Sequence, residues 1–333
     1  MNKRPKVLVV GSFVMDLIVS TEKFPNSGET VLGKSFRTAP GGKGANQAVQ
    51  AARLGADVTM VGKVGNDDFG KSLINSCKES GIHTEFVAVD PDVSSAVGDV
   101  MLEVAEGKSA KNRIIVVSGA NMTITPEDVA FLKDTIGQYD MVILQLEIPM
   151  SINEIVAKYA FDKGVPVMLN SAPSAPLSQK LLSCLTYISP NEHEAADLTG
   201  IQIRKEGKAV NQDDVKLVVN SLLSKGVKNV VITLGNAGAV VANETEFVYQ
   251  PCIDVVEVKD PTAAGDSFVG AFTSAVCSGL NHDQALNFAN YTATLTVSRM
   301  GAQPSLPKLQ EVVELMKRED HSDFEFSLLD GLK

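Results

Sequence analysis

The most informative stretch of the chain is Asp260-Pro-Thr-Ala-Ala-Gly-Asp-Ser-Phe-Val-Gly-Ala-Phe272, which reads as a turn of small residues followed by a buried helix. Ala263, Ala264 and Gly265 are too small to block a ligand, so their backbone N–H groups can bind an anion at the helix N-terminus. Asp266 then lies beside the bound phosphate. Because a carboxylate repels phosphate, its presence predicts a general base for an attacking hydroxyl. The alternative is an Asp that only complements the helix dipole.

A second cluster of glycines lies far upstream, in Pro40-Gly-Gly-Lys-Gly-Ala-Asn-Gln-Ala48, and leads into a helical pattern over residues 45–54. Its glycines let the backbone approach a ligand closely. Lys43 and Asn46 supply a cation and an amide, which can bind hydroxyl groups or phosphate. One glycine run of this kind is usually only a turn. Together the two clusters are far more specific for a ligand site than either is alone.

Short apolar and β-branched runs alternate with helical patterns along the chain. The predicted strands lie at residues 7–10, 58–61, 141–144, 165–169, 187–189 and 230–233. This alternation predicts an α/β fold with a doubly wound, mostly parallel sheet flanked by helices, in three layers. Continuous apolar runs such as residues 141–144 fit strands that are buried on both sides.

Two segments depart from this alternation and read as short strands without covering helices. They are residues 29–38 and 95–117, and the second contains a polar turn at 106–112. Such strands cannot form a core of their own, so we expect them to fold over the sheet as a lid or to pair with a second subunit. Residues 1–318 then form one domain with this lid inserted. Residues 319–333 form an acidic C-terminal tail, of which we expect the stretch 319–325 to be solvated.

Composition argues against several classes of protein. The chain has 333 residues, 44% of them hydrophobic, which is enough to bury one large core. A net charge of −10 without a Lys/Arg cluster argues against nucleic-acid binding. No apolar stretch approaches the roughly 20 residues that cross a bilayer. The cysteines, at 77, 184, 252 and 277, are too scattered for a disulfide framework or a zinc site, so we expect a cytoplasmic protein.

Both glycine-rich turns match signatures of the PfkB carbohydrate kinase family, which the chain resembles over nearly its whole length. The matches are Gly41-Gly-Lys-Gly-Ala-Asn46, followed by Gly55 and Gly65, and the stretch 260–272. Further landmarks occur in the family's order at residues 11–12, 28–30, 145–147, 191–194, 233–235 and 301–305. The resemblance is strongest to the ribokinase branch. It implies a ribokinase-like fold and ATP-dependent phosphorylation of a furanose sugar, D-ribose above all, at O5.

The resemblance also implies roles for the matching residues. Asp266 is the general base for in-line transfer, and Ala263, Ala264 and Gly265 form the anion-binding turn beside it. Charged acceptors suit sugar hydroxyls, and the implied sugar site consists of Asp16, Gly42, Lys43, Gly44, Asn46, Glu147 and Asp266. The implied ATP site consists of Asn191, Thr233, Leu234, Gly235, Asn236, Ala237, Gly238, Gly265 and Asn290.

Two cations are implied as well. Glu194, in the family's N-x-x-E element, organises Mg²⁺ largely through water, since Mg²⁺ needs few protein ligands. K⁺ is implied beside the anion-binding turn, whose geometry it would fix. Its implied site is Asp260, Thr262, Thr296, Arg299, Gly301 and Ser305, with an ordinary loop at 301–305 as the alternative. In this family the lid often mediates dimerisation, which implies a homodimer.

Residues 65–72, Gly-Asn-Asp-Asp-Phe-Gly-Lys-Ser, also satisfy the phosphate-loop pattern G-x-x-x-x-G-K-[ST]. Asp67 and Asp68 would then lie inside the phosphate cradle, where two negative charges oppose a triphosphate. We therefore predict a turn and a helix start at this stretch, and no nucleotide.

Departures from the family's pattern leave the substrate open. Val14 stands where many members of the branch have Asn, which removes one hydroxyl contact. Asp99 and Met101 lie in the predicted lid, where apolar residues would shield a sugar. A nucleoside or another pentose is therefore the alternative substrate. A non-catalytic, sugar-responsive binding protein is a further alternative, but a pure binder needs no base beside a phosphate site.

Overall fold

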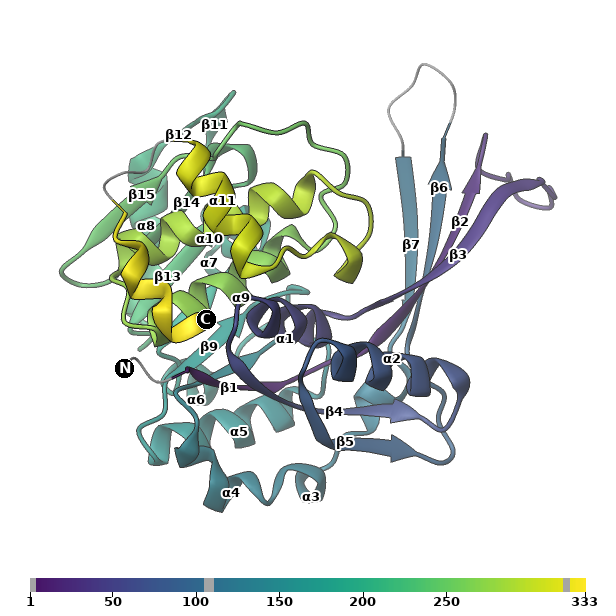
Figure 1. Cartoon of the computed structure of the whole chain (residues 1–333), viewed down its shortest axis with the longest axis horizontal. Helices are drawn as coiled ribbons and strands as arrows, with labels where there is room; N and C mark the ends of the chain where they lie inside the picture. Colours follow the sequence, from purple (N-terminus) through teal and green to yellow (C-terminus); the bar gives the residue numbers. More distant parts are fainter. Residues whose placement is uncertain (1–3, 105–110, 320–323) are drawn as a thin grey trace.

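The computed structural model describes residues 4–104, 111–319 and 324–333. Within these residues the centre of the fold is a nine-stranded sheet of order β15-β14-β13-β10-β9-β8-β1-β4-β5 (Figure 1). Neighbouring strands from β13 to β5 are parallel, whereas β14 and β15 are antiparallel to their neighbours. The strands are β1 (Lys6–Val10), β4 (Asp57–Gly65), β5 (His83–Asp90), β8 (Met141–Leu144), β9 (Val167–Asn170), β10 (Tyr187–Ser189), β13 (Asn229–Thr233), β14 (Ala239–Ala242) and β15 (Phe247–Gln250).

The predicted strands all form, as β1, β4, β8, β9, β10 and β13. Their continuous apolar runs are buried on both faces, as in β8 and β9, where every residue is buried. The sequence analysis does not predict β5, β14 and β15. The outer strands β5 and β15 are partly exposed, so their apolar patterns are weak.

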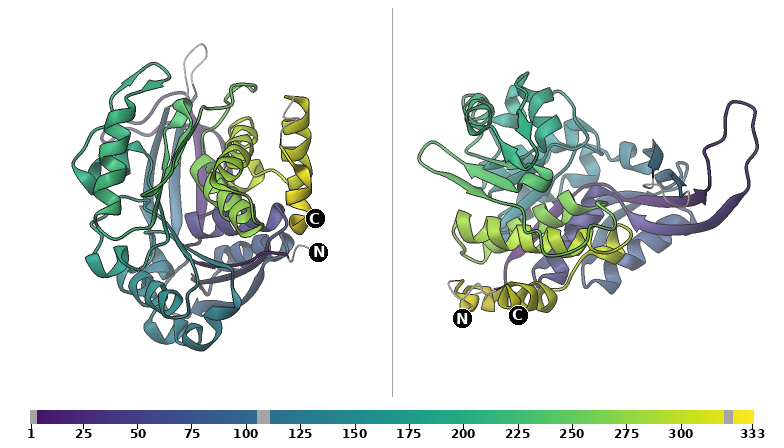
Figure 2. Two further views of the ribbon diagram at one scale, coloured as in Figure 1. Left: turned by 90° about the vertical axis from the view of Figure 1, so that its left-hand side faces the viewer. Right: turned by 90° about the horizontal axis from the view of Figure 1, so that it is seen from above.

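Helices cover both faces of the sheet, which Figure 2 shows between two helical layers. One layer shares a core with the sheet and holds α1 (Lys43–Arg53), α2 (Asp68–Glu79), α9 (Ala264–Cys277), α10 (His282–Val297) and α11 (Leu309–Arg318). The other layer packs over a second core and holds α3 (Pro126–Val129), α4 (Leu132–Thr135), α5 (Met150–Asp162), α6 (Gln179–Leu182), α7 (Glu192–Thr199) and α8 (Gln212–Leu223). None of the helices in the described ranges is long and apolar enough to cross a membrane. This three-layer arrangement confirms the predicted fold class.

A second sheet projects from the central one and forms the predicted lid (Figure 1). Its strand order is β3-β2-β6-β7, and its strands are β2 (Val14–Thr21), β3 (Gly33–Gly41), β6 (Val97–Glu103) and β7 (Lys111–Val117). The predicted lid segments supply β3, β6 and β7. The sequence analysis does not predict β2, because Asp16 interrupts its apolar pattern. The polar turn expected at 106–112 lies largely outside the described residues.

The C-terminal end of the chain packs against the core. Phe324 is buried, so the expectation of a solvated stretch at 319–325 is wrong at this residue. Residues Phe326–Leu332 form the 3-10 helix η5, and Phe324, Leu329 and Leu332 are buried. The tail lies against the end of α1. A Cβ on Gly55 would come within 1.8 Å of the carbonyl oxygen of Leu332.

Candidate active site

Three adjoining cavities meet at the N-terminus of α9. The lid cavity, of about 970 Å³, lies between the lid and the sheet and is lined by residues such as Asp16, Asn46 and Glu147. The middle cavity, of about 230 Å³, is lined by Asn191, Glu194 and residues 263–266. The outer cavity, of about 500 Å³, is lined by Gly238, Asn290 and others. The middle cavity shares Lys43, Ala263 and Asp266 with the lid cavity, and Thr233, Ala264 and Gly265 with the outer one.

The middle cavity is built on the turn that opens α9. Ala263 has φ 60° and ψ 10°, a left-handed conformation that residues other than glycine rarely adopt. Backbone strain of this kind concentrates at functional sites. The first N–H groups of a helix have no partner within it, and none of the described side chains caps this end of α9. The turn is therefore suited to bind a phosphate.

Asp266 is buried where the lid cavity and the middle cavity join. Its Oδ2 accepts a hydrogen bond from Nδ2 of Asn46 at 2.9 Å, and its Oδ1 accepts one from Nε2 of Gln47 at 2.9 Å. Both donors lie on α1, so the packing of α1 against α9 fixes the orientation of the carboxylate. A fixed carboxylate between two ligand cavities is what a general base requires.

The structure also brings in polar residues that the sequence analysis does not assign. Gln47 donates to Oδ1 of Asn170 at 3.2 Å and accepts a hydrogen bond from Nε2 of Gln145 at 2.8 Å. Ser12 donates from Oγ to Oε2 of Glu147 at 2.5 Å. These residues are uncharged neighbours of the motif residues. For Ser12, Gln47 and Gln145 the one available signal was their position within motif stretches, which does not separate them from packing residues, and Asn170 lies outside these stretches.

Lys43 carries positive charge into two of the cavities. The backbone N–H of Lys43 donates a hydrogen bond to Oε2 of Glu147 at 3.0 Å. Burial lowers the pKa of Lys43, but the carboxylates of Asp266, Glu147 and Glu194 outweigh burial and raise the pKa above its ordinary value. Lys43 is therefore protonated at neutral pH, where it can neutralise charge on a phosphate.

Gly42 and Gly44 have different positions. Gly42 lines the lid cavity with φ 94°, and a Cβ there would lie 2.7 Å from the backbone nitrogen of Val14. Gly44 is buried, and a Cβ there would lie 2.4 Å from the backbone nitrogen of Ser12. The structure thus brings Gly42 to the cavity, while Gly44 allows α1 to pack against the loop after β1.

Asp16 lies on lid strand β2 and lines the lid cavity. Its carboxylate fits between two glycines, because a Cβ on Gly98 would lie 2.6 Å from Oδ1 and one on Gly41 would lie 3.0 Å from Oδ2. Burial and, secondly, the negative charge of Glu147 raise the pKa of Asp16 from its ordinary value of 3.8 to about 6. Ionised Asp16 is a strong acceptor for hydroxyl donors, so the lid itself supplies part of the site.

The lid strands turn one apolar face toward the lid cavity, lined by Ile18, Val100, Leu102, Ile114 and Val116. Asp99 and Met101 alternate with Val100 and Leu102 along β6 and pair with Ile115 and Arg113 of β7. Alternation places these residues on the opposite face of the lid. Asp99 and Met101 therefore do not interrupt the apolar face over the lid cavity, and the expectation that they stand in place of shielding residues is wrong. Val14 does line the cavity, so that departure stands.

Asn191 and Glu194 line the middle cavity and cap α7 reciprocally. Oδ1 of Asn191 accepts from the backbone N–H of Glu194 at 2.9 Å, and Oε2 of Glu194 accepts from the backbone N–H of Asn191 at 2.9 Å. Burial raises the pKa of Glu194, and hydrogen bonds from Asn191 together with the charge of Lys43 only partly offset it. This rigid pair presents oxygen atoms opposite the anion-binding turn.

The outer cavity receives most of the predicted nucleotide residues. Its lining includes Asn191, Thr233, Gly235, Asn236, Gly238, Gly265 and Asn290. The side chains of Leu234 and Ala237 are instead buried in the core. Apolar groups such as Val256, Val258 and Phe268 give this cavity a surface suited to a flat ring.

Asp260 ties together two of the loops predicted to hold a monovalent cation. Its Oδ1 accepts from the backbone N–H of Thr262 at 2.9 Å, and its Oδ2 accepts from that of Gly301 at 2.9 Å. Burial raises the pKa of Asp260, but these hydrogen bonds outweigh it and lower the pKa below its ordinary value. The remaining predicted side chains bond elsewhere: Thr296 to Ser267, Ser305 to the carbonyl of Ala302, and Arg299 to Glu311.

The phosphate-loop pattern at 65–72 lies away from all three cavities. Lys71 is exposed and pairs with Asp68 at 3.0 Å. Asp67 caps α2 by accepting from the backbone N–H of Gly70 at 2.7 Å. The stretch forms a turn and the start of a helix, as predicted from its charge.

Comparisons with known proteins agree with this geometry. Residues 4–309 match the pfkB family carbohydrate kinases. A ribokinase of Bacillus subtilis is 41% identical over 310 residues, which cover 93% of this chain and 99% of that protein. A deoxyribokinase of Salmonella typhi is 31% identical over 311 residues, which cover 93% of this chain and 98% of that protein.

Among solved structures, that of Arabidopsis thaliana ribokinase complexed with ribose and ATP is 34% identical to this chain. It superimposes with a TM-score of 0.84 and covers 95% of this chain and 99% of that one. The sequence match extends over most of the chain, and the three-layer fold and the lid agree with it. The chain therefore belongs to the pfkB family of carbohydrate kinases.

Proposed function

We propose that this kinase transfers the γ-phosphate of ATP to the O5 hydroxyl of D-ribose. The observation that carries the proposal is the junction at Asp266, a buried carboxylate between an anion-binding turn and a cavity lined by charged groups. A small polyhydroxylated ring suits such a cavity better than an apolar ligand does. Asn46 adds to this, because its buried Oδ1 has no hydrogen-bond partner among the described residues and can accept from a hydroxyl. The ribokinase bound to ribose and ATP supports the same pair of substrates.

The arrangement supports direct in-line transfer. The proton of O5 passes to the Asp266 carboxylate while the bond between O5 and the γ-phosphorus forms. The bond from the γ-phosphorus to the bridging oxygen breaks, and its electron pair leaves with ADP. The N–H groups of Gly265 and Asp266 and the ammonium of Lys43 stabilise the charge on the transferring phosphoryl group. Closure of the lid would exclude water from the reaction.

The donor set of the middle cavity fits Mg²⁺ bound largely through water. Glu194 would hold the ion, with Asn191 orienting its carboxylate. Within the described ranges no three His, Cys, Asp or Glu side chains form a metal-binding cluster, as expected if phosphate and water supply most ligands. When bound, Mg²⁺ neutralises charge on the phosphates of ATP.

The loops at Asp260 and Gly301 fit K⁺, which favours oxygen ligands such as carboxylate and carbonyl groups. Asp260, Thr262 and Gly301 lie directly before or beside the strained turn at Ala263. A cation held there by Asp260, Thr262, Ser305 and the backbones of Thr296, Arg299 and Gly301 would fix the turn without touching substrate.

Turnover is expected to rise several-fold when K⁺ replaces a bulky organic cation at constant ionic strength, because the ion orders the anion-binding turn. Asp260→Ala should abolish this response, whatever its effect on the basal rate. The measurement is kcat in matched chloride salts for both proteins. Equal rates in the two salts for the natural chain would rule out the cation site.

Ribose is expected to exceed 2-deoxyribose by about tenfold or more in kcat/KM, because a missing hydroxyl leaves a buried charged partner unpaired at roughly 1–3 kcal/mol. The test is a screen of purified enzyme with pentoses and nucleosides, ATP and Mg²⁺. Val14→Asn should improve ribose use without changing the KM for ATP. A nucleoside or 2-deoxyribose used far better than ribose would reject ribose as the substrate and leave the kinase chemistry in place. The deoxyribokinase relative makes 2-deoxyribose the necessary comparison.

A homodimer through the lid is the proposed assembly. The lid face away from the cavity exposes Phe36, Ile115 and Val117, each by more than half. A second copy of the lid would cover this apolar face. Sedimentation should give a dimer for the natural chain and a monomer for Ile115→Glu. A natural chain that sediments as a monomer at micromolar concentration would disprove the assembly.

The proposal also covers the domain organisation of the chain and a cytoplasmic location. Residues 1–318 would form one kinase domain with the lid inserted, and residues 319–333 its tail. All four cysteines are free thiols, two of them buried, which suits the reducing cytoplasm.

A further inference from the structure

The orientation of Asp266 depends on a chain of buried side-chain amides. Gln47 on α1 is fully buried and is absent from the lining of the three described cavities. Its Nε2 donates to Oδ1 of Asp266 at 2.9 Å and to Oδ1 of Asn170 at 3.2 Å. Its Oε1 accepts from Nε2 of Gln145 at 2.8 Å. Both hydrogens and the oxygen of this amide are therefore engaged.

The neighbours of Gln47 determine which way its amide points. A side-chain amide can rotate by half a turn, which exchanges its donor and its acceptor. A rotated Gln47 would set its oxygen against Asp266 and its NH₂ against the NH₂ of Gln145. Asn170 is held in turn, because its Nδ2 donates to the carbonyl of Ser189 at 3.0 Å. Gln145, Asn170 and Ser189 lie at the carboxyl ends of β8, β9 and β10, so three neighbouring strands orient the amide.

We propose that Gln47 is a positioning residue for phosphoryl transfer. It directs the carboxylate of Asp266 toward the attacking hydroxyl, while other groups hold the sugar and the nucleotide. Small errors in the placement of a catalytic group are costly to the chemical step. Because Gln47 lines none of the cavities in the described structure, its loss should affect chemistry and spare binding. The inference rests on the proposed role of Asp266 as the base.

The test compares Gln47→Met with Gln50→Met. Gln50 is also a buried amide on α1, but its Nε2 donates to the carbonyl of Pro307 at 3.0 Å, away from Asp266. Gln47→Met is expected to lower kcat by about tenfold or more and to leave the Kd for the sugar, measured by calorimetry, within about threefold. Gln50→Met should lower the melting temperature without this loss of kcat.

Gln145→Met provides a second route if Gln47→Met fails to fold, since it frees the amide of Gln47 to rotate. It should lower kcat in the same selective way, by a smaller factor. Equal kcat losses in the Gln47 and Gln50 variants, or unchanged kcat in a folded Gln47→Met, would overturn the inference. Turnover by the natural chain is measured alongside, and its absence would reject the proposed function and not the role of Gln47.

A separate observation concerns the stretch 65–72, whose phosphate-loop pattern lies away from the three cavities. Asp67 bonds to Ser95, which precedes lid strand β6 and is buried. Its Oδ2 accepts the backbone N–H of Ser95 at 2.7 Å, and its Oδ1 accepts the Ser95 hydroxyl at 2.7 Å. Burial raises the pKa of Asp67, but the hydrogen bonds from Ser95 and Gly70 outweigh it and lower the pKa. Asp67 is therefore an ionised anchor for the root of β6.

Two glycines of the same pattern are required sterically beside Ser95, just before β6. Oγ of Ser95 accepts the backbone N–H of Gly65 at 2.9 Å. A Cβ on Gly65 would lie 2.3 Å from the backbone nitrogen of Ser95, and one on Gly70 would lie 2.9 Å from Oγ of Ser95. The small residues that imitate a phosphate loop thus make room for Ser95.

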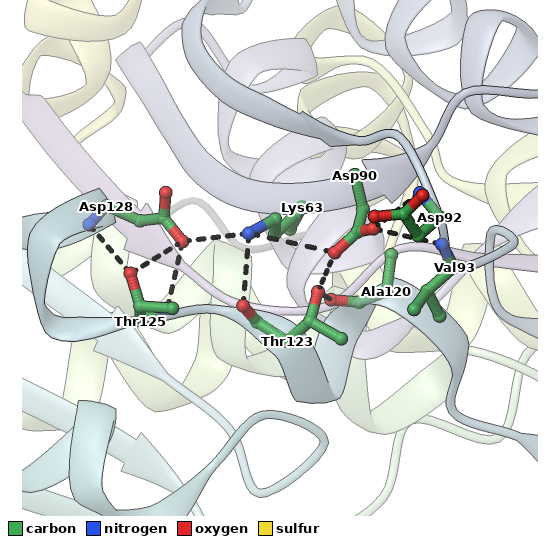
Figure 3. A network of polar contacts seen from close by, with 8 residues as sticks. All are labelled: Lys63, Asp90, Asp92, Val93, Ala120, Thr123, Thr125 and Asp128. Atoms are coloured by element: carbon green, nitrogen blue, oxygen red, sulfur yellow. Dashed lines mark hydrogen bonds and ion pairs between the residues drawn. The ribbon is translucent and has the colours of Figure 1, made fainter.

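A neighbouring network holds the chain on either side of β6 and β7 (Figure 3). Lys63 on β4 donates to the carbonyl of Thr123 at 3.1 Å and to Oδ2 of Asp128 at 3.2 Å. Asp90, before β6, accepts from Oγ1 of Thr123, after β7, at 2.6 Å. The lid root is therefore fixed to the central sheet at both of these strands.

The geometry points to Asp67 as a positioning residue for sugar binding by the lid. β6 runs parallel to β2, and Gly98 on β6 lies opposite Asp16. A Cβ on Gly98 would already approach the Asp16 carboxylate to 2.6 Å, so a displaced β6 disturbs that carboxylate. Loosening Ser95 should thus weaken sugar binding and leave the distant nucleotide cavity unchanged. This inference rests on the proposed binding of the sugar by Asp16.

The test uses Asp67→Ser and Ser95→Ala, with Asp68→Asn as the control. Serine still caps a helix but is too short to reach Ser95, whereas Asp68 is an exposed neighbour that pairs with Lys71. Both test variants are expected to raise the KM for the sugar by about fivefold or more, with the KM for ATP within about twofold. Their effects should be less than additive, because both remove the hydrogen bond from the Ser95 hydroxyl to Oδ1 of Asp67. An unchanged sugar KM in folded variants, or equal rises for sugar and ATP, would refute the role of Asp67.

Discussion

Asp266→Asn is expected to lower kcat by roughly 10²-fold or more, the usual order for loss of a general base. An amide cannot take the proton of the attacking hydroxyl, while the anion-binding turn and the charged walls of the lid cavity remain. The Kd for ribose should therefore change little. The measurement is steady-state kcat with ATP and Mg²⁺, together with calorimetric binding of the sugar.

The substitution also carries a predictable cost in stability. Both oxygens of Asp266 accept hydrogen bonds, so the new NH₂ must face the donor of either Asn46 or Gln47. One lost hydrogen bond at a buried site costs about 1–3 kcal/mol. A lower melting temperature is thus expected, and Asp68→Asn, at an exposed carboxylate, should change neither quantity. A folded Asp266→Asn with nearly normal turnover would remove Asp266 from the mechanism.

Activity toward ribose is expected to depend on pH through Asp16. Its pKa of about 6 means that it becomes protonated as the pH falls below neutrality. Since the ionised carboxylate is the hydroxyl acceptor, kcat/KM for ribose should fall by about tenfold per pH unit below pH 6. Bound hydroxyls favour the ionised form of Asp16. At saturating ribose, kcat should therefore stay constant down to a lower pH than kcat/KM does. The measurement is kcat/KM and kcat for ribose as functions of pH, with the same enzyme.

Asp16→Asn should lower kcat/KM for ribose by about 10- to 100-fold, because a charge-assisted hydrogen bond contributes roughly 1.5–3 kcal/mol. It should also remove the acid limb of the profile. The effect on stability has the opposite sign. The folded chain binds this proton more tightly than the unfolded chain, so ionised Asp16 opposes folding above pH 6. Asp16→Asn should thus melt at a higher temperature at pH 8. An unchanged pH profile would show that Asp16 does not bind the sugar.

The sequence was sufficient for the inner strands of the central sheet, from β13 to β4, because these buried parallel strands are continuous apolar runs, as in β8. It also led to Asp266 and Lys43 as candidates, because charged residues beside glycine-rich turns form a recognisable pattern, while Glu147 came from the family resemblance. All three line the lid cavity. Strand β2 was missed since its apolar pattern is broken at Asp16, where the carboxylate faces the cavity.

The rest of the site depends on contacts between distant parts of the chain. Gln47 and Asp266 are far apart in sequence, and only the packing of α1 on α9 brings the amide to the carboxylate. Asp99 was misjudged because its face of β6 is set by pairing with β7, which residue type does not reveal. The burial of Leu329 and Leu332 depends likewise on the surface left open beside Gly55.

The continuity of the three cavities has a consequence for inhibitor design. The outer, middle and lid cavities share lining residues at the start of α9, so one molecule can occupy all of them. On the proposed placement of ATP and ribose, we expect an adenosine joined through a short phosphate chain to a pentose to bind as a bisubstrate ligand. Linking the two parts makes the second contact intramolecular, which can raise affinity by about 10²–10⁴ over either part. Its selectivity would come from the pentose end, since that end would contact both the lid and the sheet.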